Sequence, residues 1–124
     1  MTNITKSAAA LIVKKQFDNA VSRLADLQGY VTKNPRYAAS RADDLAQYAA
    51  EHAIYNEYHE WLNSDNTVET IQKIFSSQLE SAVDRGLHYN ASDYDRRYAQ
   101  EARKILSRDD LFGMDCRLAN LIDG

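Results

Sequence analysis

The segment YAAEHAIYNEYHEWLN, residues 48–63, decides the fold class that this sequence predicts. One row of side chains through it steps by three and four residues, as one face of an α-helix does. The row consists of Leu45, Tyr48, His52, Tyr55, His59 and Leu62. A second side carries Ala42, Ala46, Ala49, Ala50 and Ala53, and Ile54 and Trp61 lie roughly opposite the first row. A helix that is apolar on so many sides belongs in the middle of a helical bundle.

The segments on either side have the same helical spacing. Predicted helices run from about Thr5 to Gln28, from Pro35 to Leu62, from Asn66 or Thr67 onward, from Asn90 or Ser92 onward, and from Asp110 to Ile122. Gly29, Pro35 and Gly86 lie where we expect helices to begin or end. No stretch alternates apolar and polar residues as a strand would. We predict an all-α, compact single-domain bundle of four to five helices over residues 1–124.

Composition narrows the class of protein. Apolar residues at 44% and charged residues at 27% are ordinary for a soluble, ordered domain. The longest apolar run, Ala8 to Val13, is far shorter than the ~20 residues that span a bilayer, and no export segment is visible. The single cysteine, Cys116, cannot form an intramolecular disulfide and fits the position of a small buried side chain. We therefore expect a cytoplasmic protein that does not enter a membrane.

Charge is unevenly distributed along the chain. Residues 1–40 hold six basic and two acidic residues, whereas residues 41–95 hold eleven acidic and three basic ones. An acidic middle third disfavours nucleic acid as the partner there and favours a protein partner with a basic surface.

Aromatic residues suggest where such a partner would bind. The chain has eight tyrosines, and Tyr30, Tyr37, Tyr58 and Tyr89 are predicted to lie at helix ends or on the polar side of the central helix. Exposed tyrosines favour interfaces, because they offer a large contact area at a low entropy cost. The predicted partner-binding residues are Asp44, Glu51, Glu57, Tyr58 and Trp61.

We therefore expect a non-catalytic protein–protein interaction module without a cofactor. By analogy of size and composition alone, such proteins occur among the accessory and inhibitory proteins of phages and mobile elements, including anti-defence proteins.

The two histidines of the central segment do not have the spacing of metal ligands. Seven residues of helix separate the Cα atoms of His52 and His59 by roughly 10 Å, whereas the ligands of one zinc ion lie about 2.0 to 2.1 Å from the metal. Asn56, the residue between them, is a poor ligand. We predict no metal site, and instead a buried polar network of Asn56, both imidazoles and the hydroxyl of Tyr48 or Tyr55.

Three alternatives stay open. The helix 94–108 carries the five basic residues Arg96, Arg97, Arg103, Lys104 and Arg108, so a small nucleic-acid-binding regulator is the first. Acidic residues interleave with these, which lowers the rank of this alternative. An enzyme with a site around His52, Asn56 and His59 is the second. A homodimer is the third, because the apolar row of the first helix could also pair two chains.

Overall fold

The computed structural model describes residues 3–106 and 116–123. Four α-helices make up most of it: α1 (Lys6–Lys33), α2 (Ala42–Leu62), α3 (Val68–Leu87) and α4 (Asp93–Leu106). A 3-10 turn at Pro35–Tyr37 lies between α1 and α2, and a second one at Leu118–Asn120 lies near the C-terminus. The strands β1 (Ile4–Thr5) and β2 (Leu121–Ile122) pair in parallel, with Ile4 beside Leu121. The predicted all-α class is confirmed, because the described residues are mostly helical. The one addition among them is the small two-stranded sheet.

Side chains and one proline set the helix ends. The Thr5 hydroxyl accepts a hydrogen bond from the Ala8 amide at the start of α1, and Thr67 does the same for the Thr70 amide at the start of α3. Ser92 accepts from the Asp95 amide at the start of α4. Pro35 follows the end of α1, as expected of a residue that cannot continue a helix.

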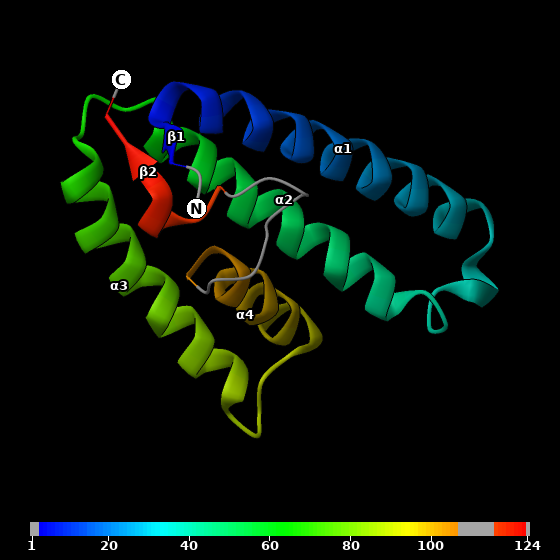
Figure 1. Ribbon diagram of the computed structural model, residues 1–124. Helices are drawn as coiled ribbons and strands as arrows, with labels where there is room; N and C mark the ends of the chain where they lie inside the picture. The colour runs from blue at the N-terminus through cyan, green and yellow to red at the C-terminus, as the bar shows by residue number, and fades with distance from the viewer. Residues whose placement is uncertain (1–2, 107–115, 124) are drawn as a thin grey trace.

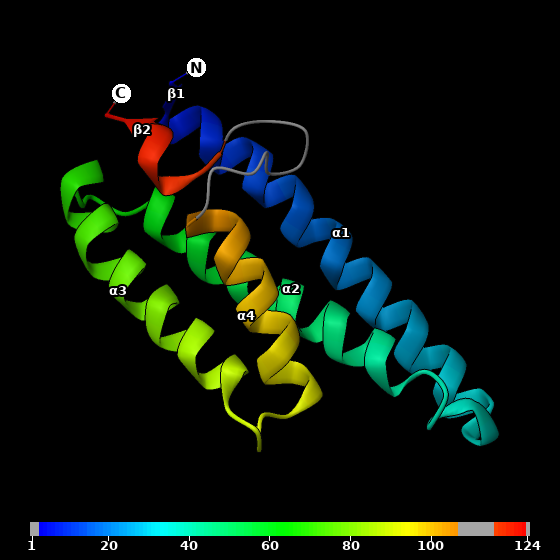
Figure 2. The same ribbon diagram turned by 60° about the horizontal axis from the view of Figure 1, so that its bottom comes forward.

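The helices form two antiparallel pairs that meet through α2 and α4. Helix α1 packs on α2, α2 packs on α4, and α4 packs on α3, so α2 lies between α1 and α4 (Figure 1). The turned view shows the same order, with α4 between α2 and α3 (Figure 2). The predicted central position of residues 48–63 is therefore confirmed.

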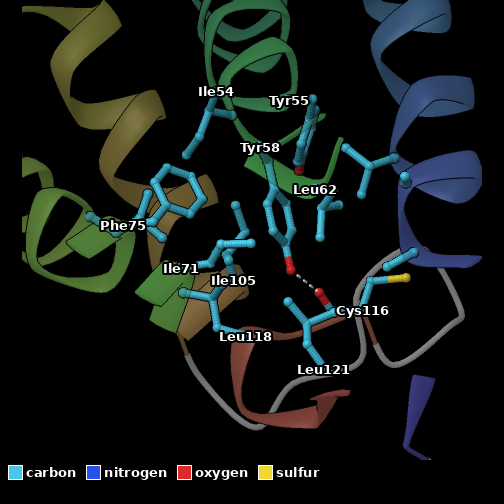
Figure 3. Close-up of a cluster of buried hydrophobic side chains, with 14 of the residues drawn as sticks. Ile54, Tyr55, Tyr58, Leu62, Ile71, Phe75, Ile105, Cys116, Leu118 and Leu121 are labelled. Atoms are coloured by element: carbon cyan, nitrogen blue, oxygen red, sulfur yellow. Dashed lines mark hydrogen bonds between the residues drawn. The ribbon is translucent and has the colours of Figure 1, made fainter. Parts of the chain in front are cut away.

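A buried cluster closes the end of the bundle where both termini lie. Tyr58, Phe75, Ile54 and Ile71 are fully buried there, and Tyr58 donates a hydrogen bond of 2.6 Å to the carbonyl of Cys116 (Figure 3). The C-terminal segment 116–123 is held by further bonds. The Gln72 amide donates to the Leu118 carbonyl, and the Val68 backbone N–H donates to the Asp123 carboxylate.

Three predicted boundaries are wrong. Helix α1 passes through Gly29 and ends at Lys33, because one exposed glycine costs a helix only about 1 kcal/mol. Helix α2 begins at Ala42, since Pro35–Tyr37 forms a separate 3-10 turn. The predicted helix 110–122 lies outside the described residues up to position 115. Beyond that point it is a 3-10 turn followed by β2.

Candidate partner-binding site

Five acidic residues lie along α2, and the three nearest its N-terminus each face a cation. These pairs are Asp43 with Arg97, Asp44 with Arg41 at 3.2 Å, and Glu51 with Arg23 at 3.9 Å. Arg97 uses two nitrogens on Asp43, and this hydrogen bond lowers the pKa of the Asp43 carboxyl. Asp43, Asp44 and Glu51 therefore carry charges that neighbouring residues of the same chain already balance.

Glu51 also belongs to a polar network between α2 and α4. The Gln47 amide nitrogen lies 2.8 Å from Glu51 and 3.2 Å from Glu101, donating to both carboxylates. Glu101 is only 2% exposed, and it also accepts hydrogen bonds from Tyr55 and Lys104. Burial raises the pKa of the Tyr55 hydroxyl, and the nearby Glu101 carboxylate raises it further. This network satisfies a buried charge, so its members have a structural role.

Tyr58, a predicted binding residue, lies in the core. It is 0% exposed, and burial raises the pKa of its hydroxyl. Helical spacing places Tyr58 on the same strip as Asp44 and Glu51. That strip is open near the start of α2, but the C-terminal segment covers it at Tyr58, where the hydroxyl binds the Cys116 carbonyl. The predicted exposure of Tyr58 is therefore wrong.

Glu57 and Trp61 lie together on another side of α2. With Glu60, Ser64 and Asn66 they line an open groove of about 340 Å³, which we call the Trp61 groove. The half-buried indole of Trp61 packs on Phe75, with 5.9 Å between ring centroids. One oxygen of Glu57 accepts a hydrogen bond of 3.1 Å from the Tyr98 hydroxyl. Both the aromatic wall and one carboxylate of the groove are thus fixed by neighbouring helices.

The carboxylates of this groove differ from the others on α2. Among the described residues, no Lys or Arg nitrogen lies within 4.0 Å of either Glu57 or Glu60. A cation does lie at the rim of the groove, where the Lys6 ammonium donates hydrogen bonds to the backbone carbonyls of Ser64 and Asn66. In the described part of the chain, the two carboxylates of α2 that form no ion pair therefore lie beside Trp61.

Of the predicted binding residues, the structure thus brings only Glu57 and Trp61 together in one groove. Glu60 also lines the groove and was not among the predicted binding residues. Its position was detectable, because Glu57, Glu60 and Trp61 have the three- and four-residue spacing that places side chains on one side of a helix.

The histidines are held by other partners than predicted. His59 shares a hydrogen bond of 2.8 Å with the Asn63 amide, and the His52 ring stacks on Phe17 at 5.1 Å. Tyr55 donates to Glu101. The predicted network around Asn56 is therefore wrong for His59 and Tyr55. Over residues 3–106 and 116–123, no group of three or more His, Cys, Asp or Glu side chains is arranged to hold a metal ion.

The basic residues of α4 are mostly engaged within the chain. Arg96 contacts Asp93 and the Ala91 carbonyl, Arg97 contacts Asp43, and Lys104 contacts Glu101. Arg103 is exposed, and Arg108 lies outside the described residues. A nucleic acid on this helix would have to compete with those ion pairs for three of the five predicted contacts.

Other aromatic residues are exposed at the ends of the helical pairs. Tyr89 is 88% exposed and stacks on His88 in the turn between α3 and α4. Tyr30 is 44% exposed and stacks on the half-buried Tyr37 near the turn between α1 and α2.

Within the described part of the chain, none of the helices combines the length and the apolar character needed to cross a membrane. Comparison with known proteins finds no family model, no curated protein and no solved structure that matches this chain.

Proposed function

We propose that this chain is a non-catalytic protein–protein interaction module, and that it binds a partner with a basic surface through the Trp61 groove. One observation carries the proposal. Two carboxylates that form no ion pair with any described residue flank a fixed, half-buried indole, whereas the other three acidic residues of α2 are ion-paired. Tryptophan at a rigid, partly buried position is typical of the residues that dominate binding energy at interfaces.

The proposed binding surface differs from the predicted one, because it lies at the C-terminal end of α2 and leaves out Asp44 and Glu51. Asp44 and Glu51 already face arginines of the same chain, so part of their negative charge is balanced before a partner binds. Glu57 and Glu60 form no such ion pair with any described residue. The proposed place of action is the cytoplasm, because a chain with a single cysteine gains no intramolecular disulfide from an oxidising compartment.

Affinity capture with charge-reversal variants tests this proposal. Tagged wild-type chain is incubated with nuclease-treated extract of the source organism, beside the variants Glu60→Lys and Glu80→Lys. Glu80 is exposed on α3 and does not line the groove, so its reversal changes the net charge equally at another site. We expect wild type and Glu80→Lys to retain the same protein, and Glu60→Lys to lose it.

Capture that is equal for all three chains would contradict the proposal. Capture that occurs only from an aliquot of the extract without nuclease treatment would contradict it too, and would instead support a role for α4. Circular dichroism and thermal melting of each variant confirm that the fold is intact. Glu60 suits the test because its side chain is exposed at the end of α2.

A further inference from the structure

The geometry points to an arginine side chain of the partner as the occupant of the Trp61 groove. This inference rests on the proposed function and adds the chemical group that the groove recognises. Three features of the groove favour arginine: its aromatic wall, the placement of its carboxylates and its rigidity.

The aromatic wall of the groove is the indole of Trp61. Trp61 lines the groove and is the largest aromatic side chain available for contact with a cation. Indole is the strongest of the protein aromatic groups in attracting cations to its face, and arginine occupies such positions more often than lysine. A planar guanidinium can lie against a ring system over its whole area, whereas an ammonium group is a compact, strongly hydrated charge.

The carboxylates supply the second half of arginine recognition. Glu57 and Trp61 are four residues apart on α2, and Glu57 and Glu60 are three apart, so all three project from one side of its last two turns. The Tyr98 hydroxyl occupies one oxygen of Glu57, at 3.1 Å, and leaves the other oxygen available to a ligand. A guanidinium has several N–H donors in one plane and can bond to carboxylates while stacked on the ring.

Rigidity distinguishes this groove from an arbitrary acidic surface. Trp61 is fixed against Phe75 in the core, and Glu57 is fixed by Tyr98 of α4. A site that is already ordered loses little conformational entropy on binding, so a single side chain can be held there. The groove, at about 340 Å³, has room for a guanidinium and its stem.

The inference can be tested on the full chain with small probes, because Trp61 is the only tryptophan. The probes are the N-acetyl N-methylamide of arginine, the same derivative of citrulline, which has the same shape without the charge, and the lysine derivative. Binding is followed by the fluorescence of Trp61 and by the NMR shift of its indole N–H. We expect a saturable response to the arginine probe, with affinity for the citrulline probe about tenfold or more weaker.

Variants locate the response. Glu60→Gln removes one carboxylate without changing the size of the side chain and is expected to weaken the arginine probe about threefold or more, while Glu80→Gln leaves the affinity unchanged. The inference is overturned if the arginine response does not saturate, if citrulline or lysine binds as well as arginine, or if Glu60→Gln has no effect.

The two proposals fail in different ways. Protein capture that depends on Glu60, combined with no arginine binding at Trp61, would overturn the inference and leave the interaction function in place. Arginine binding at Trp61, combined with protein capture that Glu60→Lys does not change, would overturn the proposed function instead.

Discussion

Gly29 and Gly86 both lie inside helices, and the space around each decides what an added methyl group would do. No atom lies within 4 Å of the Cβ position at Gly29. At Gly86 the same position is 2.3 Å from the Ala99 Cβ and 3.1 Å from the Asp95 carbonyl oxygen. Gly86 therefore permits the close approach of α3 and α4.

The two glycines should respond in opposite directions to replacement by alanine. Gly29→Ala is expected to raise the free energy of unfolding by up to about 1 kcal/mol, through helix propensity. Gly86→Ala is expected to lower it by about 1 kcal/mol or more, because α4 must shift to admit the methyl group. Urea denaturation measures both, and each variant serves as the control for the other. Equal stability of the two variants would show that α3 and α4 are not in close contact at Gly86.

At the scale of the single residue, the structure contradicts the predicted exposure of Tyr58, whereas Glu57 and Trp61 line a groove. All three are close in sequence, and helical spacing alone determines only which side of α2 each occupies. What covers that side is decided by segments distant in sequence. The Cys116 carbonyl, 58 positions after Tyr58, is the contact that buries it.

At the scale of the element, α3 shows how a helix end combines a local and a distant cap. Thr67 accepts from the Thr70 amide within the same turn, and Asp123 accepts from the Val68 amide at 3.0 Å. The aspartate also places a negative charge at the positive end of the helix dipole. The first cap was predictable from the sequence, whereas the second joins residues 55 positions apart.

Asp123→Ala tests the distant cap. We expect the free energy of unfolding to fall by about 1 kcal/mol, and hydrogen exchange at the Val68 amide to become faster. Asp65→Ala is the matched control, since Asp65 is exposed and lies in the loop just before α3. If both variants lose the same stability, general charge rather than capping accounts for the effect.

At the scale of the whole molecule, buried tyrosines link stability to alkaline pH. Burial raises the pKa values of Tyr55 and Tyr58 above their ordinary value of 10.0. Between that value and the folded-state pKa, the folded chain holds protons that the unfolded chain releases. The stabilising contribution of each tyrosine is therefore complete below pH 10 and is lost as pH rises further.

We expect the free energy of unfolding to decrease above pH 10 by about 1.4 kcal/mol per pH unit for each of these tyrosines. Replacing Tyr58 by phenylalanine should remove one such contribution and make the decline less steep. Tyr89→Phe should leave the slope unchanged, because Tyr89 is 88% exposed. Urea denaturation at a series of pH values from 8 to 11 measures the slopes. Identical slopes for Tyr58→Phe and wild type would contradict the burial of this hydroxyl.

The sequence by itself determined the helical class and the central position of α2. It also narrowed the starts of two helices to Asn66 or Thr67 and to Asn90 or Ser92, and the structure has caps at Thr67 and Ser92. These follow from interactions within a few residues, such as the spacing of apolar side chains and the bond from a hydroxyl to an amide one turn away. Only the tertiary structure decided that Glu51 lies beside Arg23 and that Tyr58 is buried. It also decided that Glu57, Glu60 and Trp61 share a groove, and that no described Lys or Arg forms an ion pair with either glutamate. Those outcomes depend on which helix or terminal segment covers each side of α2, and that is set by the packing of the whole chain.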